Sequence, residues 1–489
     1  MNYFDLHVHP SIRGGLSISP AKYTAWDELN IKINLPPPLN KFEQIINSQA
    51  TLTLLNTGQV LAVVVLHATE IAFARNRIIN KILANPIVTD LNQSLFDDIR
   101  LNRITYFKVF QKDLQQLLDA STKPPKKFKI IKNIGELDLT QLNAILSIEG
   151  AHCFQDKYNT DPADDVCNSI VTNFRNFKQN KKFRFHHLTL AHLSRQPACV
   201  HCFGVKMKKI IDFFPEVEFT PDSSKMGISK LGKDIIKEAY NNNLTPSVLI
   251  DIKHMSLVAR KQFYQFRREN GWEKIPIIAS HLGVTGVSYD DLRIKDIVWD
   301  RKTKCYKVFW YSKPGLCGTK FNPWTIGLYD EEIIEILNSL GLIGISLDQR
   351  IIGEGYIYSE QMSKLEVPQL NLRKTLKPVN YIAPVSVKED ESIFSAFFEI
   401  PGIRDILSIE GIREFFLPTL KDDREFGNEI IFPFDEPEHA TTKRGVIQPS
   451  HIDYLANNIL HVLKVGLENG FTVQMKNLMY ESVFALAVI

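Results

Sequence analysis

The chain has 489 residues, of which 44% are hydrophobic and 23% are charged, and its formal net charge is +3. This composition is typical of a globular protein with a large core, and the near balance of charge argues against nucleic acid as the main partner. No apolar run reaches the roughly 20 residues that span a bilayer. The first residues carry no secretory leader and the six cysteines suggest no disulfide framework, so we expect reduced thiols and a cytoplasmic protein.

Seven short apolar runs, rich in β-branched residues, predict strands along the chain. They cover residues 3–9, 59–67, 143–150, 183–192, 246–254, 275–281 and 341–348. Several are almost continuously apolar, as is typical of parallel strands buried on both faces. Amphipathic patterns at 231–242 and 329–341 predict helices between them. This alternation favours an α/β fold, a (β/α)8 TIM-type barrel, over a doubly wound sheet.

We interpret residues 1–489 as a single barrel with three long insertions. They lie at about 85–140, 287–322 and 350–445, where the strand and helix patterns do not continue. Long segments that follow barrel strands lie on the functional rim of such a fold. The "CVHC" segment at 199–202 has CxxC spacing, but a single such pair does not complete a tetrahedral structural zinc site.

Polar residues stand where most of the predicted strands end, each as the first strongly polar residue after an apolar run. In chain order they are His7 and His9, Glu149, His192, His254 and His281. The carboxyl ends of parallel barrel strands emerge on one rim, so we expect these side chains to converge there. Five histidines and one carboxylate suit a binuclear site for two divalent metal ions, with zinc favoured. Glu149 can bridge such a pair, which activates a water as hydroxide and polarises a carbonyl.

Each of these residues also has an ordinary structural explanation. A lone histidine at a strand end is more often a satisfied polar group, and we interpret His152, His186 and His187 in this way. Glu149 alone could form a salt bridge on the rim, and His192 alone could be a core histidine. The coincidence of so many such residues at strand ends favours one shared site.

Seven segments, in order along most of the chain outside the insertions, point to a known family. They are "DLHVHP", "ILSIEGAH", "FHHLTLAHLSRQP", "LGKDIIKEAYNNNLTPSVLIDIKHMS", "IIASH", "NPWTIGLYDEEI" and "HIDYLANNILHVLKVG". In these segments the chain resembles the membrane (renal) dipeptidase family of the amidohydrolase superfamily. The resemblance implies that His7, His9 and Glu149 hold one metal ion, and that Glu149, His254 and His281 hold the other. It also implies that His192 contacts the substrate carbonyl or the tetrahedral oxyanion.

Three features depart from that family. The first motif has His9 where the dipeptidases usually carry aspartate. The family's substrate-carboxylate arginine, expected just before Asn322, is absent, and Lys320 offers substrate a point charge without the bidentate fork. The family's eighth strand ends in a Gly-Ser-Asp-Phe-Asp-Gly segment whose first aspartate handles protons, and the chain lacks it. Asp348 belongs with the seventh strand instead.

We therefore predict a binuclear metallohydrolase that cleaves a dipeptide or related amide bond by attack of metal-bound hydroxide. Glu149 and His192 are the predicted catalytic residues, and His192 and Lys320 the predicted substrate contacts. The partner is the small peptide or amide substrate, and the sequence leaves a homodimer open. Two alternatives stand beside this reading. One is a catalytically impaired or non-catalytic metal-binding barrel without the strand-eight aspartate, and the other is a different amidohydrolase, such as a lactonase or deaminase.

The end of the chain raises a separate hypothesis. "SVFALAVI" at 482–489 is apolar enough for the eighth strand, but it carries no acid and no helix follows it. Residues 485–489 can be encoded so that a neighbouring reading frame gives Ile-Gly-Ser-Asp, the start of the missing family segment. We therefore expect 471–489 to be atypical, in a frameshifted or truncated chain that still binds metal through its upstream residues.

Overall fold

The computed structural model describes residues 3–11, 24–27, 51–56, 59–75, 93–122, 128–156, 164–204, 219–243, 245–315, 319–346, 349–353, 359–370 and 449–471. Three features named above lie outside these residues: the candidate eighth strand at 482–489, Asp348, and most of the predicted insertion at 350–445.

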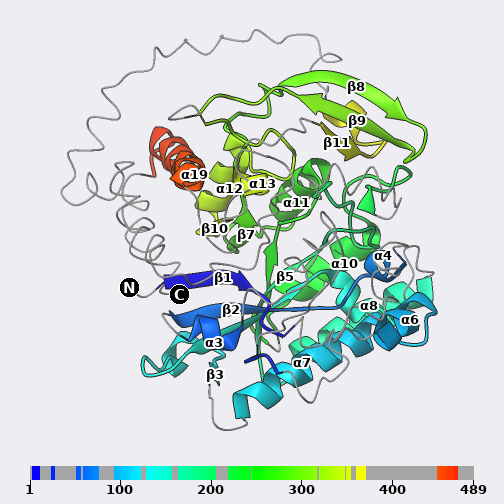
Figure 1. Cartoon of the computed structure of the whole chain (residues 1–489), viewed down its shortest axis with the longest axis vertical. Coiled ribbons are helices and arrows are strands. Elements are labelled where there is room, and N and C mark those ends of the chain that lie inside the picture. Colours follow the sequence, from blue (N-terminus) through cyan, green and yellow to red (C-terminus); the bar gives the residue numbers. More distant parts are fainter. Residues whose placement is uncertain are drawn as a thin grey trace, which may run out of the picture.

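Seven parallel strands with helices around them form a nearly closed barrel, which confirms the predicted fold class (Figure 1). In hydrogen-bonded order they are β1 (Tyr3–Val8), β2 (Gln59–His67), β4 (Asn143–Glu149), β5 (Phe185–Thr189), β6 (Leu249–Asp251), β7 (Ile277–Leu282) and β10 (Leu342–Ile345). The two-residue strand β3 (Lys129–Ile130) also pairs with β4. Each of the seven predicted runs overlaps one of the seven barrel strands.

The two end strands, β1 and β10, approach each other without pairing among the described residues. A Cβ atom on Gly344 of β10 would lie 3.0 Å from Leu6 Cδ2 on β1 and 2.0 Å from the Ser280 carbonyl oxygen on β7. Only glycine fits that crowded position.

Strand β2 shows why the barrel strands are almost continuously apolar. Its successive side chains alternate between two buried clusters because strand side chains point to opposite faces. Leu61, Val63 and Val65 pack with Leu6 of β1, whereas Ala62, Val64 and Leu66 belong to the larger cluster that includes the helix residues. Both faces are therefore covered, as in other parallel sheets.

Helices cover the outside of the barrel. The longer ones are α6 (Gln93–Arg100), α7 (Tyr106–Thr122), α8 (Asp164–Lys178), α10 (Lys230–Tyr240), α11 (Leu257–Glu269), α12 (Asp330–Asn338) and α19 (Pro449–Glu468). The shorter ones are α3 (Leu52–Leu55), α4 (Ile71–Arg75), α13 (Gln349–Ile352), α14 (Val367–Leu370), η2 (Ile134–Glu136) and η3 (Ala151–Phe154). The two helices predicted at 231–242 and 329–341 are confirmed as α10 and α12. Within the described part of the chain, none of the helices combines the length and the apolar character needed to cross a bilayer.

A small antiparallel sheet lies beside the barrel (Figure 1). It consists of β11 (Ser359–Met362), β9 (Cys305–Trp310) and β8 (Ile294–Asp300), in that order. Two buried carboxylates join this region to the barrel loops. Glu360 accepts hydrogen bonds from the main-chain nitrogen and the hydroxyl of Thr325, at 2.9 and 2.8 Å. Glu366 accepts from Gly227 N at 2.9 Å and from Ser256 Oγ at 2.7 Å.

A buried ion pair ties α11 to α12. Arg260 and Glu332 are both fully buried, and Arg260 donates to the two carboxylate oxygens of Glu332 at 2.6 and 2.8 Å. The guanidinium also donates to the carbonyl oxygens of Met255, Thr325 and Gly327. Because its donors are so fully used, this arginine organises the segment that leads into α12.

We expect Arg260→Ala to lower the free energy of unfolding by about 3–5 kcal/mol, because it leaves the buried Glu332 without its cation. Arg268→Ala is the matched control on the same pair of helices: Arg268 pairs with Glu335, and their side chains are 51% and 33% exposed. An exposed pair of this kind contributes less than about 1 kcal/mol. Urea denaturation of the two variants measures both values, and equal losses would contradict a special role for the buried pair.

Candidate metal centre

Every predicted metal ligand lies at the carboxyl end of a barrel strand. His7 and His9 stand at the end of β1, Glu149 is the last residue of β4, and His281 is the penultimate residue of β7. His254 follows the end of β6 by three residues. The strands of this barrel are parallel, so these side chains meet at one rim.

The structure brings all five residues together around Glu149, whose side chain is buried. Its Oε1 atom lies 3.5 Å from His7 Nε2, 3.4 Å from His254 Nε2 and 3.9 Å from His281 Nε2. Its Oε2 atom lies 3.1 Å from His9 Nε2. One carboxylate therefore contacts histidines from three other strand ends.

These contacts form two groups that share Glu149. His7, His9 and Glu149 form one, Glu149, His254 and His281 form the other, and the ligand atoms within each group lie within 4.8 Å of one another. The Nε2 atoms of His7 and His9 face each other at 2.9 Å. Atoms bonded to one zinc ion at about 2.0–2.2 Å lie roughly 3–3.5 Å apart in tetrahedral geometry. The donor set and spacing of each group therefore fit a divalent metal ion, and Glu149 belongs to both groups.

The protonation states suit metal binding. Burial lowers the pKa of His7 and lowers that of His254 to about 3, and it takes the pKa of His281 well below the usual range. These rings are therefore neutral at neutral pH, which is the form that ligates metals. Burial alone would raise the pKa of Glu149, but the nearby histidines, His192 and His7 foremost, hold it well below its usual range.

Hydrogen bonds on the far side of two rings fix their orientation. His9 Nδ1 lies 3.1 Å from the carbonyl oxygen of Val65 on β2, and donation there leaves Nε2 as the ligand atom. His281 Nδ1 lies 2.7 Å from Ser280 Oγ, which donates to Asp251 Oδ2 at 2.6 Å. The Asp251 carboxylate thus orients His281 through a serine hydroxyl.

Backbone geometry contributes at two of the strand ends. His254 has a φ of 64°, in the left-handed region that a non-glycine residue adopts at a cost of about 1–3 kcal/mol. Gly150 follows Glu149 with a φ of 91°, and a Cβ there would lie 2.2 Å from the His152 ring. Both positions turn the chain sharply where a ligand leaves its strand.

His192 differs from the other histidines because it contacts two carboxylates. Its Nε2 lies 3.3 Å from Glu149 Oε2, and its Nδ1 lies 3.2 Å from Glu70 Oε2. Burial would lower the pKa of His192, but Glu149 and Glu70 together raise it to about 9. The other oxygen of Glu70 accepts from Ser194 N and Gln196 Nε2, both at 3.2 Å. Glu70 is therefore a fixed, fully buried anion behind His192.

Two residues of the cluster escape the sequence prediction, His67 and Glu70. His67 is the last residue of β2 and forms a third group with Glu149 and His192, again within 4.8 Å. Its Nδ1 lies 3.2 Å from the main-chain oxygen of Glu149. The rule that found the other histidines applies to His67 as well, since it ends an apolar run. Glu70 stands in a loop and carries no comparable signal.

The other histidines named from the sequence, and Lys320, occupy other surroundings. His152 is buried and its Nε2 lies 2.9 Å from the Ala68 carbonyl oxygen, although it also groups with His67 and Cys153. His186 and His187 face each other on β5, with their Nδ1 atoms 3.0 Å apart. Lys320 is exposed, at an isolated bridge with Pro314.

Comparisons with known proteins add little to this geometry. No protein-family model matches the chain, and no curated protein does. Among solved structures, the chain is similar to the probable dipeptidase PvdM from Pseudomonas aeruginosa, with 11% identity, 85% of this chain and 69% of that chain covered, and a TM-score of 0.37. It is also similar to an amidohydrolase from the same organism, with 12% identity, 52% of this chain and 58% of that chain covered, and a TM-score of 0.29. At these values neither likeness decides what this chain does.

We expect the protein to retain about two equivalents of zinc after loading and dialysis, measured by elemental analysis. Glu149→Ala should lose most of both, because this carboxylate serves both groups, whereas His7→Ala should empty one position and leave the other partly occupied. His186→Ala is the matched control, since it removes a strand histidine outside the cluster. Chelation should lower the melting temperature of the parent protein, because ions that bind the folded state stabilise it. Normal zinc content in Glu149→Ala would refute the shared-ligand arrangement.

Proposed function

We propose that this chain is a binuclear metal-dependent hydrolase of the amidohydrolase superfamily that cleaves a dipeptide or a related amide bond. The observation that carries the proposal is the buried Glu149 shared by two pairs of histidines, with His192 Nε2 3.3 Å from one of its oxygens. Two zinc ions are the favoured cofactor, and a cytoplasmic location is our expectation.

A metal pair in such a site supplies Lewis acidity and a nucleophilic water at neutral pH. The protein's own residues would divide the other tasks. Glu149 would hold both ions at a fixed spacing, and the ring orientations of His9 and His281 are set by Val65 and Asp251. His192 would donate from Nε2 to the substrate oxygen that gains negative charge, an electrostatic role that requires no movement.

Glu70 supports that role of His192 in two ways. Its negative charge favours the imidazolium form, and its hydrogen bonds from Ser194 N and Gln196 Nε2 hold it in place if the histidine ring turns. A cation held by a fixed anion is pre-organised for charge that develops at the reacting carbonyl.

A hydrolysis screen of the zinc-loaded protein tests the proposal. Its arms are L,L-dipeptides, L,D-dipeptides, N-acyl amino acids, lactones and amino-substituted heterocycles, and we expect turnover in one of the first three. With the substrate so found, His192→Ala should keep its zinc and lose about 10²–10³-fold in kcat, as when one oxyanion donor is removed. Glu70→Gln should lose about tenfold, since it keeps the shape of the side chain without the charge, and His186→Ala should match the parent.

Different failures have different meanings. Turnover of a lactone or heterocycle alone would favour another amidohydrolase activity. Two bound ions without turnover in any arm would favour a non-catalytic metal-binding barrel. Unchanged turnover in a zinc-replete His192→Ala would show that the role given to His192 is wrong.

A further inference from the structure

A further group of metal-binding side chains lies next to the metal centre, at the end of β2. Among the described residues, four groups of three potential ligands have their ligand atoms within 4.8 Å of one another. Three of these groups contain Glu149, and the fourth consists of His67, His152 and Cys153. This fourth group, the His67–His152–Cys153 cluster, offers two imidazoles and a thiol, whereas the metal centre offers imidazoles and a carboxylate.

Two segments that are distant in sequence form the cluster. His67 is the last residue of β2, whereas His152 and Cys153 are consecutive residues of η3, the turn that follows β4. Gly150 connects β4 to η3, and a Cβ atom at this position would lie 2.2 Å from the His152 ring. The glycine therefore leaves room for that ring to turn toward β2. The His67 and His152 rings meet edge to face, with their centroids 5.3 Å apart.

The cluster is closed to solvent, as structural zinc sites in proteins are. His67 is 4% exposed, His152 1% and Cys153 0%. The three side chains lie against two main-chain oxygens. His67 Nδ1 and Cys153 Sγ lie 3.2 and 3.3 Å from the Glu149 oxygen, and His152 Nε2 lies 2.9 Å from the Ala68 oxygen.

These distances suit a single zinc ion after small side-chain rotations. Zinc binds histidine nitrogen at about 2.0–2.1 Å and cysteine sulfur at about 2.3 Å, so the atoms around one ion lie roughly 3–4 Å apart. The main-chain oxygen of Glu149 already has that spacing from His67 Nδ1 and Cys153 Sγ, so it is placed to be a fourth ligand. A thiolate with two imidazoles selects zinc over the harder magnesium and calcium ions.

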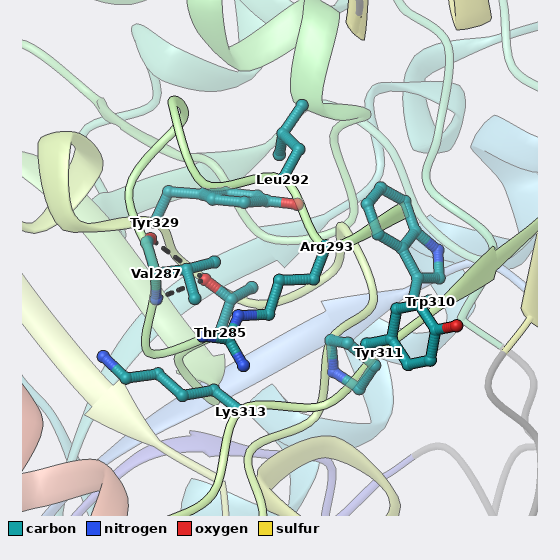
Figure 2. A pocket seen from close by; sticks show the side chains of 9 residues that line it. Thr285, Val287, Leu292, Arg293, Trp310, Tyr311, Lys313 and Tyr329 are labelled. Carbon is teal, nitrogen blue, oxygen red and sulfur yellow. Dashed lines mark hydrogen bonds between the residues drawn. The ribbon is translucent and has the colours of Figure 1, made fainter. Parts of the chain in front are cut away.

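The pocket beside the small sheet provides a contrast (Figure 2). Its lining includes Arg293, Trp310, Tyr311 and Lys313, and none of the nine residues described there is a histidine, cysteine, aspartate or glutamate. Polar side chains gather at that pocket without a donor set for zinc. The ligand types, rather than a sheltered polar position alone, therefore distinguish the cluster.

We propose that the His67–His152–Cys153 cluster binds a third zinc ion, with the main-chain oxygen of Glu149 as the fourth ligand. On binding, the thiol gives one proton to solvent, and each imidazole keeps its single proton on the nitrogen that faces away from the ion. A main-chain oxygen is a weaker ligand for zinc than histidine or thiolate. We therefore expect this ion to exchange with free metal, in contrast to the two ions at the metal centre.

The ion would connect the end of β2 to the turn after β4. Glu149 would then serve the metal centre through its carboxylate and the cluster through its main-chain oxygen. Binding at the cluster would hold the strand end that presents this carboxylate, and it would stabilise the folded state. The proposal depends on the three side chains and not on hydrolysis of any substrate.

Titration of the full chain with cobalt(II) tests the proposal, because cobalt replaces zinc in sites of this kind. A thiolate bound to cobalt gives a sulfur-to-metal charge-transfer band in the near ultraviolet, and the nitrogen and oxygen ligands of the metal centre give none. At equilibrium with free cobalt, the parent protein should show the band with the amplitude of one thiolate per chain. Cys153→Ser should abolish it. Cys199→Ser is the matched control, the same substitution at another buried cysteine, and should keep the band in full.

Absence of the band in the parent protein, or an undiminished band in Cys153→Ser, would overturn the third zinc site. A band lost in Cys199→Ser and kept in Cys153→Ser would also overturn it, in favour of the CxxC segment at 199–202. His152→Asn leaves the thiol in place, should weaken cobalt binding about tenfold or more, and serves if Cys153→Ser is unstable. Because the band reports the thiolate alone, it appears whether or not the protein is a hydrolase, so the two proposals fail separately.

Discussion

The buried carboxylate of Glu149 is the constraint around which this rim of the barrel is built. An ionised carboxylate without partners is too costly to bury, and here the side chain is 2% exposed. Its oxygens are met by histidine rings from the ends of β1 and β7 and from the loops after β5 and β6. Most of those rings are themselves kept neutral by burial, so they solvate the carboxylate only partly. The arrangement becomes balanced when cations lie between the rings and the carboxylate, which is the physical reason for proposing metal there.

In a parallel barrel, the convergence of side chains at one rim can be predicted from the sequence. Where a strand is apolar almost throughout, the first strongly polar residue near its carboxyl end stands out and marks the rim, as Glu149 and His281 do. That signal brought together the five predicted ligands and His192 without any knowledge of contacts, and the same signal was available at His67. The family resemblance in the quoted motifs predicted roles for these residues, but it did not predict which other residues contact them.

The supporting residues were beyond the reach of sequence patterns for a different reason. Glu70 and Asp251 act through hydrogen bonds across strands or loops that are distant in sequence, as the bond from Gln196 to Glu70 illustrates. A carboxylate in a loop is an ordinary surface residue until the fold buries it. The small sheet poses the same difficulty, because the pairing of β9 with β11 joins segments about 50 residues apart.

Buried charge also explains how the small sheet is held against the barrel. Arg260 and Glu332 fix the segment from Thr325 to α12, Glu360 binds Thr325 from β11, and Glu366 binds the loop that precedes α11. Each of these groups is buried and hydrogen-bonded to main-chain atoms, so a change of position would leave buried polar groups without partners. Hydrophobic contact alone has no such directional requirement, so it would not fix the position of the sheet relative to the barrel. These bonds therefore tie the sheet region to the segments that lead into α11 and α12.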